Sequence, residues 1–163
     1  MELRDDDLLL RPIQLTDAEA IVTACGDEDI ARFIPLIASP YTRADAEAWI
    51  ERCLEVWRRG ESYPFAITDA GSGELLGAIE VHARGGTVGY WVASGARNRG
   101  IATRALRLVC DLVPERPLRL TAHPDNAASQ RVAEKAGFRR VGLAPHEPLF
   151  RDGTREVVLF ELG

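Results

Sequence analysis

The sequence contains few cysteines, and they form no recognisable site. Cys25, Cys53 and Cys110 lie far apart and include neither a Cys-x-x-Cys pair nor a Cys/His cluster, so no metal site is indicated. Each lies in an apolar pattern of helical spacing, which is typical of a small buried side chain. We therefore expect all three to be core residues of a protein from a reducing compartment.

A long apolar segment and an excess of basic residues are also missing. The N-terminal run Leu8–Leu10 follows an acidic start and is too short for a signal sequence or a membrane span, which predicts a cytoplasmic protein with no membrane partner. The 20 Lys and Arg residues are outnumbered by 25 Asp and Glu residues. Because phosphate contacts need clustered basic side chains, no nucleic-acid partner is expected.

The composition is that of one globular unit. The 163 residues are 46% hydrophobic, which allows a sizeable core, and 28% charged. No repeat, linker or low-complexity tract divides the chain. We expect a single domain over residues 1–163.

The N-terminal part predicts one strand and two helices. A strand is expected over Leu8–Ile13, followed by a short helix whose first amides are capped by Thr16 and Glu19. Residues 27–40 read as a partly ordered connection. A clearer helix, with one apolar stripe, runs from a Thr42 cap to Gly60.

From Tyr63 onward the apolar pattern changes to the alternation of strands. Three strands are predicted in an antiparallel meander, with turns at residues 71–73 and at Gly85-Gly86. They cover Phe65–Ile67, Leu75–His82 and Thr87–Val92.

The remaining pattern alternates helices and strands. It predicts a helix over Gly100–Leu112, a strand over Leu118–Ala122, a helix over Asn126–Ala136 that ends at Gly137, and a hairpin of Phe138–Leu143 with Arg155–Phe160. This order indicates an α+β fold in which helices cover a sheet.

The segment Arg97-Asn98-Arg99-Gly100-Ile101-Ala102 joins a strand directly to a helix. Several unpaired amides point outward there, at the positive end of the helix dipole, and form an anion site. Gly100 permits close approach, Ala102 is small, and Arg97 and Arg99 add charge-assisted bonds to a pyrophosphate. A glycine at a helix start with solvated arginines is the alternative. The motifs of P-loop and Rossmann proteins are absent.

Three motifs in this region resemble those of one family. Arg97-x-x-Gly100-x-Ala102 resembles the acetyl-CoA pyrophosphate signature of the GNAT N-acetyltransferase superfamily. Residues 126–138 resemble the Asn-x-x-Ser…Glu-Lys-x-Gly-Phe helix of its Rim-type branch, the ribosomal-protein N-acetyltransferases, and Gly89–Val92 resembles that branch's fourth strand.

The resemblance implies a fold and a set of acetyl-CoA contacts. The GNAT fold has a twisted, mostly antiparallel sheet of six to seven strands with about four helices, splayed between the family's fourth and fifth strands. Unpaired backbone at the splay binds the pantetheine arm like an added strand. The implied contacts are Trp91 and Val92 for the arm, Arg97, Arg99, Gly100, Ile101, Ala102 and Thr103 for the pyrophosphate, and Asn126 and Ser129 toward the thioester.

The proton donor of many family members is missing here. Those members use a Tyr seven residues after the helix-starting Asn to protonate the departing thiolate, and this chain has Ala133. Rim-like members have Ser at the position of Ser129, which becomes the candidate for hydrogen-bonding or protonating the sulfur. The alternative is that Ser129 only bonds back to a helix carbonyl.

The proton acceptor is predicted from strand register. A lysine with a pKa of ~10.4 is almost fully protonated at neutral pH. An α-amine with a pKa of ~7.7–8.0 is partly neutral and can react with the help of a weaker base. If Gly85-Gly86 forms a two-residue turn, Glu80 lies opposite Trp91 beside the splay and becomes the general-base candidate. A solvated or ion-paired glutamate is the alternative.

The histidines give a weaker signal than Glu80. His82, His123 and His146 are dispersed, and His123 is the best placed because it precedes the Asn126 helix. No nucleophile elbow supports a hydrolase.

We therefore expect acetyl transfer from acetyl-CoA to a primary amine, on a protein N-terminus or a small molecule, by direct attack in a ternary complex. A non-catalytic acyl-CoA-binding or regulatory module is the alternative, and a homodimer stays open. In the family that the chain resembles, acceptor pockets are built from variable segments, which implies residues 25–40 and 144–153 here, and their sequence does not indicate which amine is bound.

Overall fold

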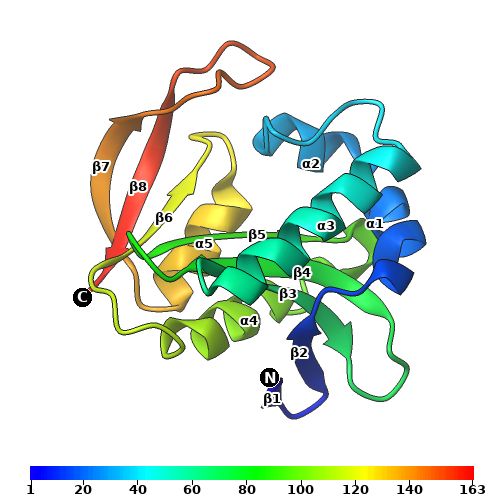
Figure 1. The fold of residues 1–163 in the computed structure, drawn as a ribbon. Helices are drawn as coiled ribbons and strands as arrows, with labels where there is room; N and C mark the ends of the chain where they lie inside the picture. The colour runs from blue at the N-terminus through cyan, green and yellow to red at the C-terminus, as the bar shows by residue number, and fades with distance from the viewer.

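The computed structural model covers residues 1–163 and contains one eight-stranded sheet in the order β1-β2-β3-β4-β5-β6-β8-β7 (Figure 1). All neighbours are antiparallel except β5 and β6. The strands are β1 (Leu3–Asp5), β2 (Leu8–Pro12), β3 (Ser62–Asp69), β4 (Leu75–His82), β5 (Thr87–Val92), β6 (Leu118–Ala122), β7 (Arg139–Pro145) and β8 (Glu156–Leu162).

Five α-helices and two 3-10 helices accompany the sheet. They are η1 (Leu15–Asp17), α1 (Ala18–Cys25), α2 (Glu28–Phe33), α3 (Arg43–Arg59), η2 (Ser94–Ala96), α4 (Ile101–Cys110) and α5 (Ala127–Lys135). The α+β class and the mostly antiparallel sheet are confirmed. The additional helix lies in the predicted connection, where the Asp27 side chain caps α2 by accepting from the Asp29 amide at 2.9 Å.

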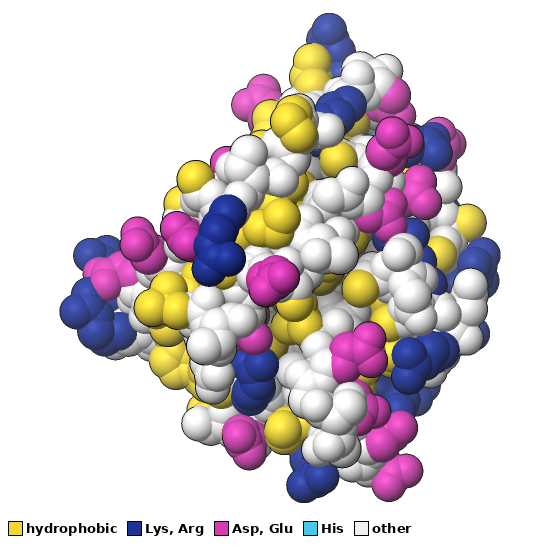
Figure 2. Space-filling view, turned by 90° about the vertical axis from the view of Figure 1, so that its right-hand side faces the viewer, with side chains coloured by type: hydrophobic (Ala, Val, Ile, Leu, Met, Phe, Trp, Pro, Cys, Tyr) yellow, Lys and Arg dark blue, Asp and Glu magenta, His cyan; other side chains and the backbone are white.

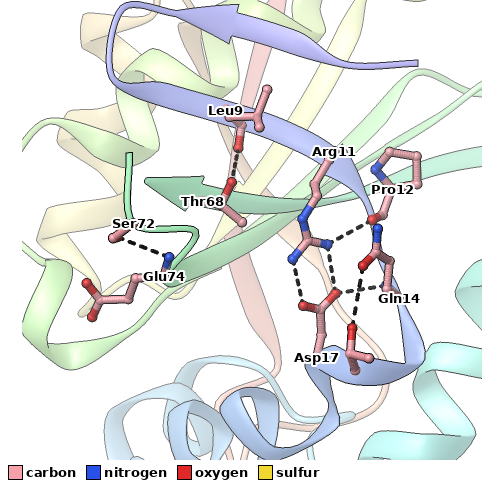
Figure 3. Close-up of polar contacts among 9 residues, drawn as sticks. Leu9, Arg11, Pro12, Gln14, Asp17, Thr68, Ser72 and Glu74 are labelled. Carbon is pink, nitrogen blue, oxygen red and sulfur yellow. Dashed lines mark hydrogen bonds and ion pairs between the residues drawn. The ribbon is translucent and has the colours of Figure 1, made fainter. Parts of the chain in front are cut away.

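The first helix begins differently from its prediction. The predicted Thr16 cap is wrong, because Asp17 accepts the Gln14 amide at 2.8 Å and also pairs in bidentate fashion with the Arg11 guanidinium at 2.8 and 2.9 Å (Figure 3). This carboxylate is only 6% exposed. Its charge-assisted bonds to a strand residue outweigh a local hydroxyl cap and tie β2 to the start of α1.

Two apolar cores lie on opposite faces of the sheet. One core joins α1 and α3 to sheet residues that include Ala66, Ala78 and Trp91. The other joins α4 and part of α5 to residues that include Phe65, Ile67 and Val88. The sheet is therefore covered on both faces (Figure 1). Cys25, Cys53 and Cys110 are all buried, as predicted.

Two predicted helix ends are confirmed by glycines in the left-handed region. Gly60 ends α3 with φ +66°, and Gly137 follows α5 with φ +95°. Thr42 caps the other end of α3, where its hydroxyl oxygen accepts the Asp45 amide at 3.2 Å.

The register of the β4–β5 hairpin corrects a prediction. Glu80 pairs with Gly89, and Trp91 pairs with Ala78, so the connecting loop has four residues (83–86) rather than two. The loop is longer because its backbone groups bond elsewhere. The Gly86 carbonyl accepts the Arg119 amide at 2.7 Å, and the Ala83 amide donates to the Glu61 carbonyl at 3.0 Å.

The surface carries both signs of charge in close mixture. Figure 2 shows acidic and basic side chains interspersed over one face. No helix in the structure combines the length and apolarity that crossing a bilayer requires.

Candidate functional site

β5 and β6 separate soon after they begin, as the family resemblance predicted. Their parallel pairing is limited to Thr87 with Arg119 and Val88 with Leu120, although β6 pairs along all five residues with β8 on its other edge. Figure 1 shows the two strands running apart. From Gly89 to Val92, the edge of β5 that faces β6 therefore has no strand partner.

The segment between β5 and α4 presents a row of unpaired amides. Asn98 and Gly100 adopt left-handed conformations, with φ +61° and +71°, and turn the chain into α4. The first helical bond runs from the Arg104 amide to the Gly100 carbonyl, at 3.1 Å. None of the amides of residues 98–103 donates to a protein acceptor. Six consecutive free donors at the positive end of a helix are a favourable place for an anion.

The two arginines of this segment differ in their partners. Arg97 forms ion pairs with Asp27 at 2.9 Å and Asp29 at 3.5 Å, at the start of α2. Arg99 is exposed and forms no ion pair, but it lies close enough to contribute to the lowered pKa of Asp69, which hydrogen bonds from Ser72 chiefly cause. Arg99 is the arginine available to an incoming anion, whereas Arg97 joins the loop to α2.

The Ser129 hydroxyl contacts a tyrosine that the sequence reading missed. Tyr90 Oη lies 2.9 Å from Ser129 Oγ and 3.3 Å from the Ser129 carbonyl oxygen. Ser129 Oγ has no other protein partner, so the alternative of a bond back to a helix carbonyl is wrong. Tyr90 belongs to the Gly89–Val92 motif, but its role could not be read before α5 was placed against β5.

Asn126 is the N-cap of α5. Its side-chain oxygen accepts the Ser129 amide at 3.1 Å, which leaves the side-chain nitrogen without a protein acceptor. Asn126 and Ser129 therefore present one free amide group and one hydroxyl from the same helical turn. Ala133, where many family members have Tyr, is fully buried in the core.

Glu80 is ion-paired, which is the alternative that the sequence left open. Arg52 of α3 donates to both carboxylate oxygens, at 2.6 and 3.2 Å, and Ser62 Oγ lies at 2.5 Å. Burial by itself raises the pKa of Glu80, but the bonds from Arg52 and Ser62 outweigh it and hold the pKa below its usual value. Glu80 is therefore a weak proton acceptor.

The two catalytic candidates face opposite sides of the sheet. Glu80 points to α3, and its strand neighbour Gly89 leaves open space, since a Cβ there would meet no atom within 4 Å. Ser129 and Tyr90 meet on the side of α4 and α5. A carboxylate on one face could therefore accept a proton from an amine, while a hydroxyl on the other face donates to the leaving group.

His123 is buried and fully engaged. Its Nδ1 accepts the Asp125 amide at 2.9 Å, so Nε2 carries the hydrogen and donates to Asp152 at 2.8 Å. Phe33 and Phe150 pack on the ring. Asp125 and Asp152 could complete a cation cluster with His123, but both ring nitrogens are already occupied. His123 holds the β7–β8 loop to the end of β6.

The other histidines lie at the surface. His82 is 3.8 Å from Glu80, and His146 stacks on Phe150.

Similarity to known proteins agrees with this geometry. The family model of the acetyltransferase (GNAT) domain matches residues 7–139. YjcK of Bacillus subtilis (strain 168), a probable N-acetyltransferase, is 28% identical in an alignment 155 residues long that covers 87% of this chain and 86% of YjcK.

Solved structures show the same fold. RimL, the ribosomal L7/L12 alpha-N-protein acetyltransferase, in complex with coenzyme A, superposes with a TM-score of 0.87 at 15% identity, over 99% of this chain and 97% of RimL. Mycobacterium smegmatis RimJ, in complex with a CoA-disulfide, gives a TM-score of 0.83 at 23% identity, over 99% and 85%. The splayed sheet, the amide-lined loop and the match over residues 7–139 together show that this chain belongs to the GNAT acetyltransferase family.

Proposed function

We propose that the protein is a single-domain enzyme that transfers the acetyl group of acetyl-CoA to a primary amine by direct attack in a ternary complex. The observation that carries this proposal is the row of six free amides at residues 98–103, directly beside the unpaired edge of β5. Amides at a helix start suit a pyrophosphate, and an unpaired strand edge suits the amide-bearing pantetheine arm.

The donor contacts follow from this placement. The pyrophosphate lies on the amides from Arg99 to Thr103, with the guanidinium of Arg99 beside it. The backbone of Trp91 and Val92 pairs with the arm, which then passes the free side-chain amide of Asn126. This route brings the thioester to Ser129.

The chemistry divides between the two faces of the sheet. The amine approaches on the α3 side, through the space left by Gly89, and its lone pair attacks the thioester carbonyl. The nitrogen becomes cationic and strongly acidic on attack, so even the weakly basic Glu80 can take its proton, directly or through water. On the α5 side, the Ser129 hydroxyl donates to the sulfur as the C–S bond breaks.

The lowered pKa of Glu80 favours an acceptor that needs little help to lose its proton. An α-amine, with a pKa near ~7.7–8.0, is partly neutral at pH 7 without any base, whereas a lysine near ~10.4 is not. RimL, which shares this fold, is an alpha-N-protein acetyltransferase. A protein N-terminus is therefore the favoured acceptor class, ahead of small-molecule amines.

A non-catalytic acyl-CoA-binding module is the second candidate. The Arg52 ion pair that neutralises Glu80, together with the alanine at position 133, favours it. The two candidates differ in turnover and not in CoA binding.

Thiol release from acetyl-CoA, measured over a panel of N-terminal peptides and small amines, separates the candidates. The proposal expects amine-dependent release, fastest with α-amines. Tight CoA binding without amine-dependent release anywhere in the panel would establish the binding module instead.

A further inference from the structure

We infer that Tyr90 is a positioning residue, whose phenol holds the Ser129 hydroxyl in the orientation that lets it donate to the leaving sulfur. This inference rests on the proposed acetyl transfer and adds a residue to it. Tyr90 is on β5 and Ser129 is on α5, so their bond crosses the boundary where β5 and β6 no longer pair.

The first support is that Ser129 is free of its usual partners. A serine in the first turn of a helix commonly bonds back to a carbonyl three or four residues earlier. Here the Asp125 carbonyl accepts the Ala127 amide, and the Asn126 carbonyl accepts the Gln130 amide. Asn126 also provides the cap, so Ser129 Oγ makes no hydrogen bond within α5. Its single protein contact is Tyr90.

The second support is the number of hydrogens that the two hydroxyl groups can donate. Burial raises the pKa of Tyr90 to about 12, so the phenol keeps its proton at neutral pH. Each hydroxyl has one hydrogen to donate. When Tyr90 donates to Ser129 Oγ, and Ser129 Oγ makes no bond to a helix carbonyl, the Ser129 hydrogen remains available for a third group. The reverse direction would leave the sulfur without a donor from Ser129.

The third support is geometric. Tyr90 Oη lies within 3.3 Å of two atoms of one residue, Oγ and the carbonyl oxygen. This double contact fixes both the side chain of Ser129 and the first turn of α5 relative to β5. The pantetheine arm is proposed to bind along the same strand, so a hydroxyl fixed to β5 is fixed relative to the thioester.

The step balances without a change in Tyr90. The amine nitrogen forms a bond to the thioester carbon, and the electron pair of the C–S bond goes to sulfur. Ser129 donates a hydrogen bond to the forming thiolate. Glu80 takes the proton that the nitrogen loses, directly or through water, and the thiolate takes up a proton from solvent as CoA leaves as the thiol. Tyr90 keeps its proton throughout and acts only through Ser129.

Tyr90→Phe tests the inference, because it removes one oxygen and retains the ring. We expect kcat to fall roughly threefold to tenfold, which corresponds to one neutral hydrogen bond, while the KM for acetyl-CoA and the Kd for CoA stay unchanged. Tyr63→Phe is the matched control. Tyr63 is also half-buried and packs on Trp57, but its hydroxyl makes no hydrogen bond, so its removal should leave kcat unchanged.

A double-mutant cycle separates positioning from packing. Ser129→Ala should lower kcat roughly tenfold to a hundredfold, as expected for a bond to a charged group, and Tyr90→Phe should have no further effect in that background. A Tyr90→Phe loss that persists in the Ser129→Ala background, or that appears equally in the Kd for CoA, would overturn the inference.

The outcomes for the two proposals are distinct. No amine-dependent release by the unaltered protein defeats the proposed function. Release by the unaltered protein, with Tyr90→Phe as active as Tyr63→Phe, defeats only the role of Tyr90. Unfolding midpoints of all variants show whether each comparison is made between folded proteins.

Discussion

The donor side and the proposed acceptor side of the site are built in opposite ways. The proposed donor side is largely one contiguous segment, residues 89–103, which presents unpaired backbone amides at the start of one helix, and Asn126 and Ser129 of α5 complete it. The acceptor side consists of α2 and the β7–β8 loop, which are far apart in sequence. Arg151 donates to the carbonyls of Ala31, at 2.5 Å, and of Ile37, and thereby joins the two segments.

This difference explains what each side can tolerate. Backbone donors remain when side chains change, so the donor side is sensitive to charge and bulk at a few positions. The acceptor side depends on long-range side-chain bonds, including the His123–Asp152 pair and the Arg32–Asp125 ion pair. Its shape can change through single substitutions. Arg97, paired with Asp27 and Asp29, joins the two sides.

The strongest test of the donor side is Ala102→Glu. A carboxylate in the first turn of α4 would repel a pyrophosphate, and a repulsion of ~3 kcal/mol corresponds to a roughly hundredfold loss of CoA affinity in calorimetry. The fold should be unaffected, because acidic groups suit a helix N-terminus. Ala102→Ser is the matched control and should bind CoA normally. Equal affinities of the two variants would place the phosphates elsewhere.

The pH dependence of kcat/KM tests whether the ionisation of the amine or that of a group on the protein limits the reaction. The pKa of Glu80 is lowered, so Glu80 is ionised throughout the neutral range and adds no inflection there. Below the pKa of the amine, kcat/KM should therefore rise about tenfold per pH unit, up to ~7.7–8.0 for an α-amine and toward ~10.4 for a lysine. The two acceptors should give separate profiles. A common inflection for both would identify a group on the protein instead.

His123→Leu tests the stability of the acceptor side. It removes the bond to Asp152 and leaves the Asp125 amide without its acceptor, which should cost about 1–2 kcal/mol of unfolding free energy in urea titrations. The KM for the amine should rise while CoA affinity is retained. A loss of CoA affinity in His123→Leu would show that the two sides are not separable.

The smallest expected difference is between the two arginines of the donor loop. Arg99→Ala should weaken CoA roughly fivefold, the size of one exposed charge interaction. Arg97→Ala should weaken CoA less and mainly loosen α2, because its partners are Asp27 and Asp29. Hydrogen exchange of the α2 amides distinguishes the variants. The reverse ranking of CoA affinities would mean that Arg97 leaves its ion pairs when CoA binds.

Local patterns predicted what local interactions determine. The strand-to-helix loop, the Thr42 cap, and the glycines at 60 and 137 follow from neighbouring residues, and the sequence located them correctly. The length of the loop between β4 and β5 could not be predicted from its own residues, because the Gly86 carbonyl accepts the amide of Arg119, which is over thirty residues later.

Long-range contacts account for the other differences. The ion-pair partner of Glu80 is on α3, and those of Arg97 are at the start of α2, so neither partner could be identified from the sequence. Tyr90 was missed because its partner Ser129 is 39 residues away in the chain. No spacing rule connects such pairs before the fold is known.

The central claim is that CoA binds on the amides of residues 98–103 and along the edge of β5. The most direct measurement is the change in backbone amide NMR resonances during a titration with CoA. The account predicts the largest changes at residues 98–103, with further changes from Gly89 to Val92, and little change in the β7–β8 loop. Saturable binding that leaves the resonances of 98–103 unmoved would contradict it.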